Sequence, residues 1–253
     1  MKNYIVSIIS VFSVLVVFLY SGSNMQAADS PSILIQSGQK IGFLGDSITA
    51  QGTGPNGYVT LVVAGLTTNG INVTAVPAGI PGNTSAGMKK RVDRDVLSKG
   101  VDWMTLSCGV NDIHLQDKGL GVDLDQYKQN ITSILDAARA KNVKIMVLTL
   151  TPIGEDLDSP NNKSIDSYNQ FLQEIVKERG LILADVNAAF KKYLKAPPPK
   201  SFNKGHLLGD GVHPNFDGQH LMAEVVLRAF GISDEEIFKA EQTWPKTPIR
   251  RVR

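Results

Sequence analysis

The sequence predicts an α/β domain in which helices cover both faces of one parallel sheet. Apolar, strand-like runs alternate with segments of helical periodicity from residue 41 onward, and polar clusters containing glycine follow several of these strands directly. Strict alternation of strands and helices favours a parallel sheet. In open sheets of this kind, ligands and catalytic groups collect at the carboxyl ends of the strands. We therefore expect one domain with its functional residues along one edge of the sheet.

The overall composition is that of an ordinary globular protein. The chain has 253 residues, of which 42% are hydrophobic and 20% charged, and its formal net charge is +2. The near-balanced charge and the lack of a long Lys/Arg block argue against a nucleic-acid partner. Cys108 is the only cysteine, so no internal disulfide is possible and the domain depends on its hydrophobic core.

Residues 1–28 have the composition of a signal peptide. Lys2 gives a short basic start, the stretch 4–20 is nearly all apolar, and Gln26-Ala27-Ala28 offers small residues for cleavage. An uncleaved membrane anchor is the alternative, because this stretch is at the short limit for a membrane span. Cleavage is favoured because no basic stop-transfer cluster follows. We expect a secreted or periplasmic protein whose folded domain is residues 29–253.

The elements are expected in strict order along this domain. The expected strands are Ile41–Leu44, Val73–Val76, Val101–Leu106, Val143–Leu150 and Leu181–Ala184. The expected helices are Tyr58–Thr67, Ala86–Leu97, Leu124–Ala140, Ile165–Glu178 and Gln219–Phe230. The helix at 124–140 has apolar residues at a period near 3.6, and Asn142 and Gly180 are typical residues for ending the helices that precede them.

The first strand ends abruptly at Gly45-Asp46-Ser47. A serine hydroxyl at the carboxyl end of a strand is a candidate nucleophile if a base and an anion site converge on it. An ordinary turn, or a cap for the next helix, is the alternative interpretation of these residues. Cys108 is a weaker rival nucleophile, because it follows an apolar strand and is expected to be a buried small hydrophobic residue.

Three further polar clusters are expected at the same edge of the sheet as Ser47, namely Ala78–Thr84, Gly109–Asp112 and Gly209–Pro214. His213 is the candidate base that takes the Ser47 proton. Asp210, three residues earlier, is positioned to hold the imidazole and stabilise its cation. Acyl transfer at Ser47 is the chemistry that these groups would support.

An acyl-transfer site also needs fixed donors for the negative oxygen of the tetrahedral intermediate. The backbone N–H groups of Ser47 and Gly82 and the side-chain amide of Asn111 are the candidates. Gly82 has no Cβ, so its backbone can approach a substrate closely. Asp112 is expected to orient the Asn111 amide, and Asp46 to brace the loop rather than to serve as the acid of a triad, because it is adjacent to Ser47.

The remaining histidines have weaker claims on the role of base. His114 follows the Asn111 cluster and could contact substrate, and His206 could border the site. His220 falls inside the last expected helix and is expected to be structural or exposed at the surface.

These blocks together resemble a known family. Gly45-Asp46-Ser47, Gly82, Gly109-x-Asn111-Asp112 and Asp210-x-x-His213 are similar to the four blocks of the SGNH hydrolases, also called GDSL esterases/lipases, and span residues 41 to 214 in the family's order. The resemblance implies a flavodoxin-like three-layer α/β/α sandwich, the SGNH hydrolase fold, with a parallel sheet of about five strands. It also implies a Ser47-His213-Asp210 triad, an oxyanion hole of Ser47, Gly82 and Asn111, and neither metal nor cofactor.

One position departs from the family pattern. Pro77 stands where many members carry Asn at the start of the second block. This substitution puts in doubt any brace of the backbone that the Asn would give.

The loops between the blocks indicate the substrate. Segments 52–57 and 197–206 are polar, contain Gly or Pro, and are expected to rim the nucleophile, and no long apolar insertion is available to form a lid. Without an apolar trench a long acyl chain has little surface to bury, at about 0.8 kcal/mol per CH₂. The resemblance adds that many exported members of this size remove acetyl groups from carbohydrates. We therefore expect a monomeric serine esterase, free of the membrane after cleavage, acting on small-molecule or polysaccharide acetyl esters.

Other functions were weighed against this one. A lysophospholipase or thioesterase of the same family and a catalytically silent carbohydrate-binding protein remain alternatives. The Gly-x-Gly-x-x-Gly match at residues 52–57 does not fit a dinucleotide site, because it starts well after the strand and lacks the acidic residue further on. A typical α/β-hydrolase is disfavoured because the Gly-x-Ser-x-Gly elbow is absent.

Overall fold

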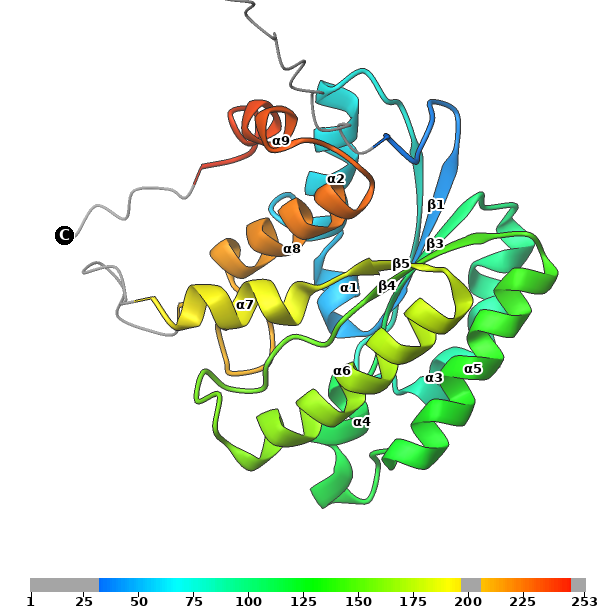
Figure 1. Cartoon of the computed structure of the whole chain (residues 1–253), viewed down its shortest axis with the longest axis vertical. Coiled ribbons are helices and arrows are strands. Elements are labelled where there is room, and N and C mark those ends of the chain that lie inside the picture. The colour runs from blue at the N-terminus through cyan, green and yellow to red at the C-terminus, as the bar shows by residue number, and fades with distance from the viewer. Residues whose placement is uncertain (1–31, 197–205, 247–253) are drawn as a thin grey trace, which may run out of the picture. The chain divides into compact units, whose positions relative to one another are not determined.

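The computed structural model describes residues 32–196 and 206–246, which form a parallel sheet between two layers of helices (Figure 1). The predicted signal peptide, residues 1–28, lies outside the described residues and stays a prediction. Within the described ranges, no helix combines the length and apolar character needed to cross a membrane.

All strand pairings of the sheet are parallel, and the strand order is β2-β1-β3-β4-β5. The strands are β1 Lys40–Gly45, β2 Thr74–Gly79, β3 Trp103–Ser107, β4 Lys144–Leu148 and β5 Ile182–Ala184. Each expected strand is present, and its ends lie within two residues of the prediction, except that β2 continues three residues further, to Gly79. The predicted α/β class and parallel sheet are confirmed.

The helices divide into two groups by their packing. The α-helices of the described residues are α1 Ser47–Gln51, α2 Tyr58–Thr68, α3 Ser85–Asp95, α4 Val110–His114, α5 Leu124–Ala140, α6 Pro160–Arg179, α7 Val186–Leu194, α8 Phe216–Ala229 and α9 Asp234–Glu241. Short 3-10 helices follow at Leu97–Lys99 and Gln116–Lys118. Helices α2, α7, α8 and α9 pack together, whereas α3 packs on α5, and α6 on α4 and α5. Figure 1 shows these groups on opposite sides of the sheet.

Local sequence signals explain where the long helices begin and end. Asp123 caps the start of α5 by accepting from the Gln126 N–H, and Asn142 just beyond its end has a φ of 56°. Ser159 caps α6 and proline occupies its first position, so α6 starts five residues earlier than its apolar periodicity predicts. Gly180 ends α6 in the left-handed conformation, as expected from the sequence.

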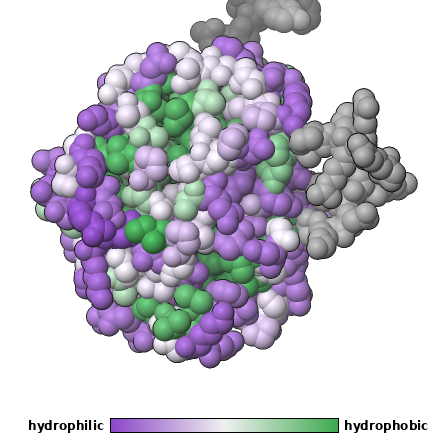
Figure 2. All heavy atoms as spheres, turned by 180° about the vertical axis from the view of Figure 1, so that it is seen from behind, coloured by the Kyte–Doolittle hydropathy of each residue, from purple (hydrophilic) through white to green (hydrophobic). Residues whose placement is uncertain are grey.

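The core is centred on β1, which is buried from its second residue onward. Ile41, Phe43 and Leu44 are fully buried, as expected for a central strand covered on both faces. The edge strand β2 is more exposed, and Pro77 lies there in register with Phe43. Proline is tolerated at a sheet edge because its missing N–H removes no hydrogen bond from a neighbouring strand. On the face seen in Figure 2, several patches of hydrophobic side chains lie among polar ones.

The strand order positions the functional edge. The connection through α2 carries the chain from β1 to one neighbour, and the connection through α3 carries it back past β1 to the other. The strand order therefore reverses at β1, and at such a switch point a crevice opens beyond the carboxyl ends of the strands. Ser47 lies two residues past the end of β1, at this crevice.

Candidate active site

Ser47 is held by a tight turn from strand to helix. Asp46 is the N-cap of α1, and its Oδ1 accepts a hydrogen bond from the Ile48 N–H at 2.9 Å. Ser47 is therefore the first residue of a helix, where backbone N–H groups have no partner within the helix. The turn requires glycine at position 45, because a Cβ there would lie 1.9 Å from Thr49 Oγ1.

The three predicted triad residues form one chain of hydrogen bonds. Ser47 Oγ lies 2.8 Å from His213 Nε2, and His213 Nδ1 lies 2.7 Å from Asp210 Oδ2. The order hydroxyl, imidazole, carboxylate and these distances are those that a nucleophile, base and orienting acid require. The structure thus brings together residues that are 166 positions apart in the sequence.

The segment that carries His213 is a turn built on the Asp210 side chain. Asp210 Oδ1 accepts from the N–H groups of Val212 and His213, at 3.0 and 2.8 Å. A bridge between Leu208 and Pro214 closes the turn. The backbone and side-chain hydrogen bonds from His213 hold the pKa of the Asp210 carboxyl well below its ordinary value. Asp210 is therefore ionised at neutral pH and well into the acid range.

Glu155, which follows β4, anchors the start of this segment. Its carboxylate accepts from the N–H groups of His206, Leu207 and Leu208, at 2.8, 2.8 and 3.0 Å. Burial alone would raise the pKa of Glu155, but these three donors lower it below the ordinary value. The sequence did not indicate this contact, because no local pattern marks a carboxylate whose partners lie about fifty residues away.

The predicted oxyanion donors lie on the segments that follow β1, β2 and β3: Ser47 and Asn111 are in the first turns of α1 and α4, and Gly82 lies in the loop after β2. Gly82 has a φ of 72°, a backbone conformation that residues with a side chain rarely adopt. The backbone conformation is therefore a second reason for glycine at this position, besides the close approach of a substrate. Asn111 is 7% exposed, and its Nδ2 donates to the Asn83 carbonyl at 3.1 Å. A primary amide has two N–H donors, so one remains for a ligand in the cavity.

Asp112 does not orient the Asn111 amide, contrary to the sequence interpretation. Its carboxylate accepts from the Ser85 backbone N–H at 2.9 and 3.1 Å and from the Ser85 hydroxyl, and Asn130 donates to that hydroxyl at 3.1 Å. Ser85 is the first residue of α3, where a negative charge is favourable. Asp112 therefore fastens the start of α3, and the Asn83 carbonyl orients Asn111 instead.

The pKa values of the two aspartates behind the site are shifted in the opposite direction to that of Asp210. Asp46 is 2% exposed and Asp112 is fully buried. Burial raises the pKa of each carboxyl to about 6. Cys108 is buried and free, burial raises its pKa, and it is not among the residues that line the cavity at Ser47.

A cavity of about 490 Å³ opens over this site. It is lined by the predicted residues Ser47, Gly82, Asn111, Asp210 and His213, together with Gln51, Pro81, His114 and Val212. Six of these nine lining residues have polar side chains. His114 therefore borders the cavity, and its contact with substrate stays a prediction.

The predicted rim of the cavity is only partly described. Residues 52–57 are not among the lining residues, contrary to expectation, because they fold into a turn in which Gly57 N–H donates to Gly54 O. Residues 197–205 lie outside the described residues, so their part in the rim stays a prediction.

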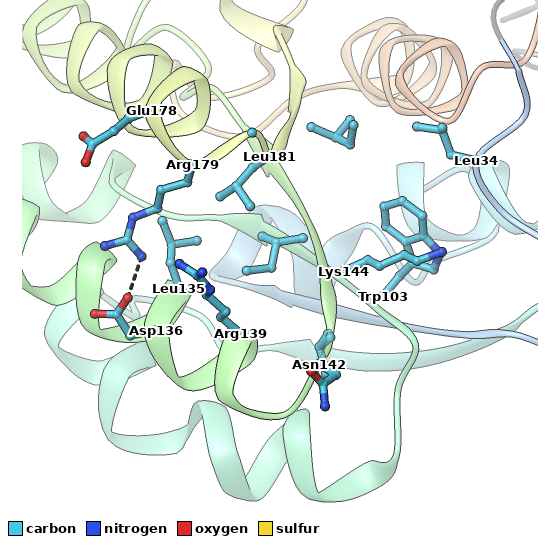
Figure 3. A pocket seen from close by; sticks show the side chains of 14 residues that line it. Leu34, Trp103, Leu135, Asp136, Arg139, Asn142, Lys144, Glu178, Arg179 and Leu181 are labelled. Atoms are coloured by element: carbon cyan, nitrogen blue, oxygen red, sulfur yellow. Dashed lines mark hydrogen bonds and ion pairs between the residues drawn. The ribbon is translucent and has the colours of Figure 1, made fainter.

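A larger cavity, of about 880 Å³, lies at the amino ends of β3, β4 and β5 (Figure 3). Lys144 lies over the Trp103 ring there, and Arg179 pairs with Asp136 at 2.6 Å. No triad residue lines this cavity, and the opposite edge of a parallel sheet is not where ligands usually bind. The smaller cavity is therefore the candidate active site.

The other histidines have different surroundings. His220 packs against Phe216 and Trp244 within the α8 and α9 region. His206 donates its backbone N–H to Glu155. Across the described part of the chain, no group of three or more His, Cys, Asp or Glu side chains is arranged to hold a metal ion.

Serine hydrolases use a serine hydroxyl that is hydrogen-bonded to a histidine, an aspartate that orients this histidine, and amide donors beside them. The site has all of these groups. The chain belongs to the GDSL-like lipase/acylhydrolase family, whose sequence model matches residues 43–221. It is a carboxylic ester hydrolase of this family, and the resemblance seen in the sequence is confirmed.

Individual relatives agree with the family. The chain is 30% identical over 215 residues to an acetylxylan esterase of Geobacillus stearothermophilus, an alignment that covers 78% of this chain and 96% of that enzyme. It is also similar to the crystal structure of Axe2, an acetylxylan esterase of that bacterium, with a TM-score of 0.71 and 29% identity over 79% of this chain and 97% of the other. LAE5, an alpha/beta hydrolase enzyme from the metagenome of Lake Arreo, Spain, gives a TM-score of 0.70 and 25% identity over 79% and 98% of the chains.

Proposed function

We propose that the protein is an exported esterase that removes acetyl groups from acetylated sugars or polysaccharides, with Ser47 as nucleophile. The observation that carries the proposal is the hydrogen-bond chain from Ser47 through His213 to Asp210, which lines a cavity that also contains the polar residues Gln51, Asn111 and His114. The same cavity contains the amide of Asn111 and the backbone of Gly82, where the charge of a tetrahedral intermediate would develop.

In the first half of the reaction Ser47 Oγ attacks the acetyl carbonyl carbon and His213 Nε2 takes the hydroxyl proton. The ionised Asp210 stabilises the resulting imidazolium. The carbonyl oxygen becomes negative and accepts from the N–H groups of Ser47, Gly82 and Asn111. When the intermediate collapses, the bond to the sugar oxygen breaks, and that oxygen leaves with the proton from His213.

The second half releases acetate. A water molecule gives its proton to His213 and attacks the acetyl group on Ser47. The bond between the acetyl carbon and Ser47 Oγ breaks, and the proton on His213 returns to Ser47. The products are acetic acid and the deacetylated sugar, and the enzyme returns to its starting state.

The cavity lining supports a short acyl group. Pro81 and Val212 supply its main apolar side chains, whereas Gln51, His114 and Asn111 are polar. Each further CH₂ of an acyl chain would bind about 0.8 kcal/mol more tightly only if apolar surface covered it. A polar alcohol such as a sugar, by contrast, can hydrogen-bond to the polar side chains.

Two further observations support the substrate and the location. The relative from Geobacillus stearothermophilus that covers most of this chain is an acetylxylan esterase. The apolar stretch and small residues of positions 1–28 support export, where a polymeric glycan would be met. N-terminal sequencing of the protein recovered outside the cytoplasm should begin near residue 29.

The experiment is active-site labelling combined with a comparison of substrates. A fluorophosphonate probe should label the protein, Ser47→Ala should abolish the label, and Cys108→Ala should keep it. The kcat/KM for p-nitrophenyl acetate should exceed that for the octanoate, and acetylated xylan should release acetate.

Each part of the proposal has its own contrary result. Unchanged labelling of the Ser47→Ala protein would refute the nucleophile. A kcat/KM that rises with chain length to octanoate would favour a lipid or thioester substrate. Binding of acetylated xylan with no release of acetate and no labelling would indicate a carbohydrate-binding protein instead.

A further inference from the structure

Arg91 is a buried charged side chain that the proposed reaction does not use. It lies on the inner side of α3, is 5% exposed and does not line the catalytic cavity. Four hydrogen bonds engage its guanidinium, which has five N–H donors in a rigid plane. Burying a charge is unfavourable unless hydrogen bonds and an opposite charge compensate for it, so these contacts define a specific environment.

Two of the contacts fix the ends of neighbouring strands. Arg91 Nη2 donates to the Gly45 carbonyl at 2.7 Å, and Nη1 donates to the Ala78 carbonyl at 2.8 Å. Gly45 is two residues before Ser47, and Ala78 lies in β2 just before the loop that carries Gly82. One planar group therefore sets the spacing of the two segments that carry the backbone donors.

The third contact reaches the side-chain donor. Arg91 Nε donates to Asn83 Oδ1 at 2.7 Å, and the Asn83 carbonyl accepts from the Asn111 amide at 3.1 Å. The fourth contact, to Asp95 at 3.2 Å, pairs the charge within α3. Arg91 thus bonds directly to the segments that carry Ser47 and Gly82, and it reaches Asn111 through Asn83.

We infer that Arg91 is a positioning residue of the oxyanion hole, which holds the loops of Ser47, Gly82 and Asn111 at the spacing that a tetrahedral oxyanion requires. The inference rests on the roles proposed above for those three donors. The inference also concerns Pro77, which stands where many family members carry Asn. Arg91 reaches from α3 to β1 at Gly45 and to β2 at Ala78, the residue after Pro77, and so connects the two strands next to this position.

The geometry gives the reason for an arginine at this position. An oxyanion hole works only if its donors lie 2.7–3.1 Å from the developing charge, and a misplacement of about 1 Å can cost about 10²-fold in rate. A lysine ammonium is a point charge on a flexible stem and lacks the planar fork that reaches divergent acceptors. Arg91→Lys therefore keeps the charge and removes the fixed spacing.

The test compares Arg91→Lys with Arg94→Lys, its matched control. Arg94 lies on the same helix and pairs with the same Asp95, at 2.6 Å, but is exposed. With p-nitrophenyl acetate, Arg91→Lys should lower kcat about 10–100-fold and leave KM within about twofold. Arg94→Lys should retain the wild-type kcat. Melting curves of both variants show whether the protein is folded at the assay temperature.

A double-mutant cycle separates positioning from a general loss of structure. Asn111→Ala alone should lower kcat about 10²–10³-fold. If Arg91 acts through the oxyanion hole, adding Arg91→Lys to Asn111→Ala should cost much less than Arg91→Lys costs alone. A merely structural effect would multiply the two losses instead.

Several results would overturn the inference. The first is a kcat of Arg91→Lys within twofold of wild type. The second is a double variant in which the kcat losses of Arg91→Lys and Asn111→Ala multiply in full. The third is a loss of kcat in Arg91→Lys that equals the fraction of unfolded protein. If Arg91→Lys does not fold, Asn83→Ala removes only the contact between Arg91 and the Gly82 loop and should lower kcat by a smaller factor; a normal kcat there would also overturn the inference. Retained activity in Ser47→Ala would instead refute the proposed function, independently of Arg91.

Discussion

The two halves of the active site are held in different ways. The half with Ser47, Gly82 and Asn111 follows the strands β1, β2 and β3 and is fastened from behind by buried charges on or against α3. The half with Asp210 and His213 is a turn at the surface, in which the Asp210 side chain is 60% and the His213 side chain 28% exposed. The half with Ser47, Gly82 and Asn111 is therefore continuous with the core, whereas the half with Asp210 and His213 lies on its surface.

The aspartates of the two halves show what this difference does to charge. Asp46, adjacent to the nucleophile, is buried, and burial raises its pKa to about 6. Asp210 is more exposed, and hydrogen bonds from His213 lower its pKa below the ordinary value. The aspartate suited to stabilise an imidazolium is thus the exposed one with several donors. Proximity to the serine in sequence does not identify it.

The largest expected effect comes from breaking the exposed half at Asp210. Asp210→Asn should lower kcat/KM by about 10³–10⁴-fold, because a neutral amide does not stabilise the imidazolium and favours the wrong tautomer. Steady-state kinetics on p-nitrophenyl acetate measures this loss. The fold should persist, since the turn lies at the surface.

The dependence of kcat/KM on pH provides a second test of the difference between Asp210 and the buried Asp46. Because the pKa of Asp210 lies below the ordinary value, Asp210 stays ionised on the acid limb of kcat/KM, so its protonation should not cause the loss of activity there. Activity should rise from acid toward neutral pH, because the base must be unprotonated to accept the Ser47 proton. A loss in Asp46→Asn as large as in Asp210→Asn would contradict the assignment of the acid.

Most of the buried half could be predicted from the sequence, because strand and helix periodicity record burial directly. The strand before Gly45, the loop with Gly82 and the Asn111 cluster were all expected at one edge of the sheet. The short helices α1 and α4 were missed because five residues are too few to show a period. Helix α9 was missed although Ser233 and Glu236 form a capping box.

The supports behind the site were not predicted, and the reasons are physical. Arg91 falls within a run of charged residues, which is typical of a solvated face. It lies three positions after the buried Met88, a spacing that indicates that both are on the same side of α3. Glu155 gives no such signal, because its partners are backbone N–H groups of a distant segment. Contacts of this kind depend on tertiary structure alone.

A smaller effect is expected from loosening the exposed half at Glu155. Glu155→Gln leaves one acceptor oxygen for three N–H donors, and a hydrogen bond to a charged group is worth about 1.5–3 kcal/mol. The turn with His213 should detach part of the time, and kcat should fall roughly tenfold. Hydrogen exchange of the amides at 206–208 should quicken.

The exposed Asp158, which lies in the same loop, provides the control. Asp158→Asn should leave both kcat and hydrogen exchange unchanged. If Glu155→Gln behaves like Asp158→Asn, the anchoring role of Glu155 is wrong. The pKa of Glu155 is lowered, so its stabilising contribution is present above the ordinary carboxyl pKa and is lost as the pH falls through the folded value. The variant should lose this dependence.

The smallest effect on activity, and the sharpest effect on stability, is expected at Asp46. An unfolded Asp46 ionises near 3.8 and the folded one at about 6, so the native state keeps a proton that the unfolded chain has lost. The resulting stability is complete below the unfolded pKa and is lost as the pH rises through the folded pKa. Asn is an equally good N-cap and never ionises, so Asp46→Asn should gain stability relative to wild type between pH 4.5 and 7.5, by about 2–3 kcal/mol. Denaturant unfolding at these two pH values measures the difference, and parallel stability curves for the two proteins would show that the buried carboxyl does not titrate as inferred.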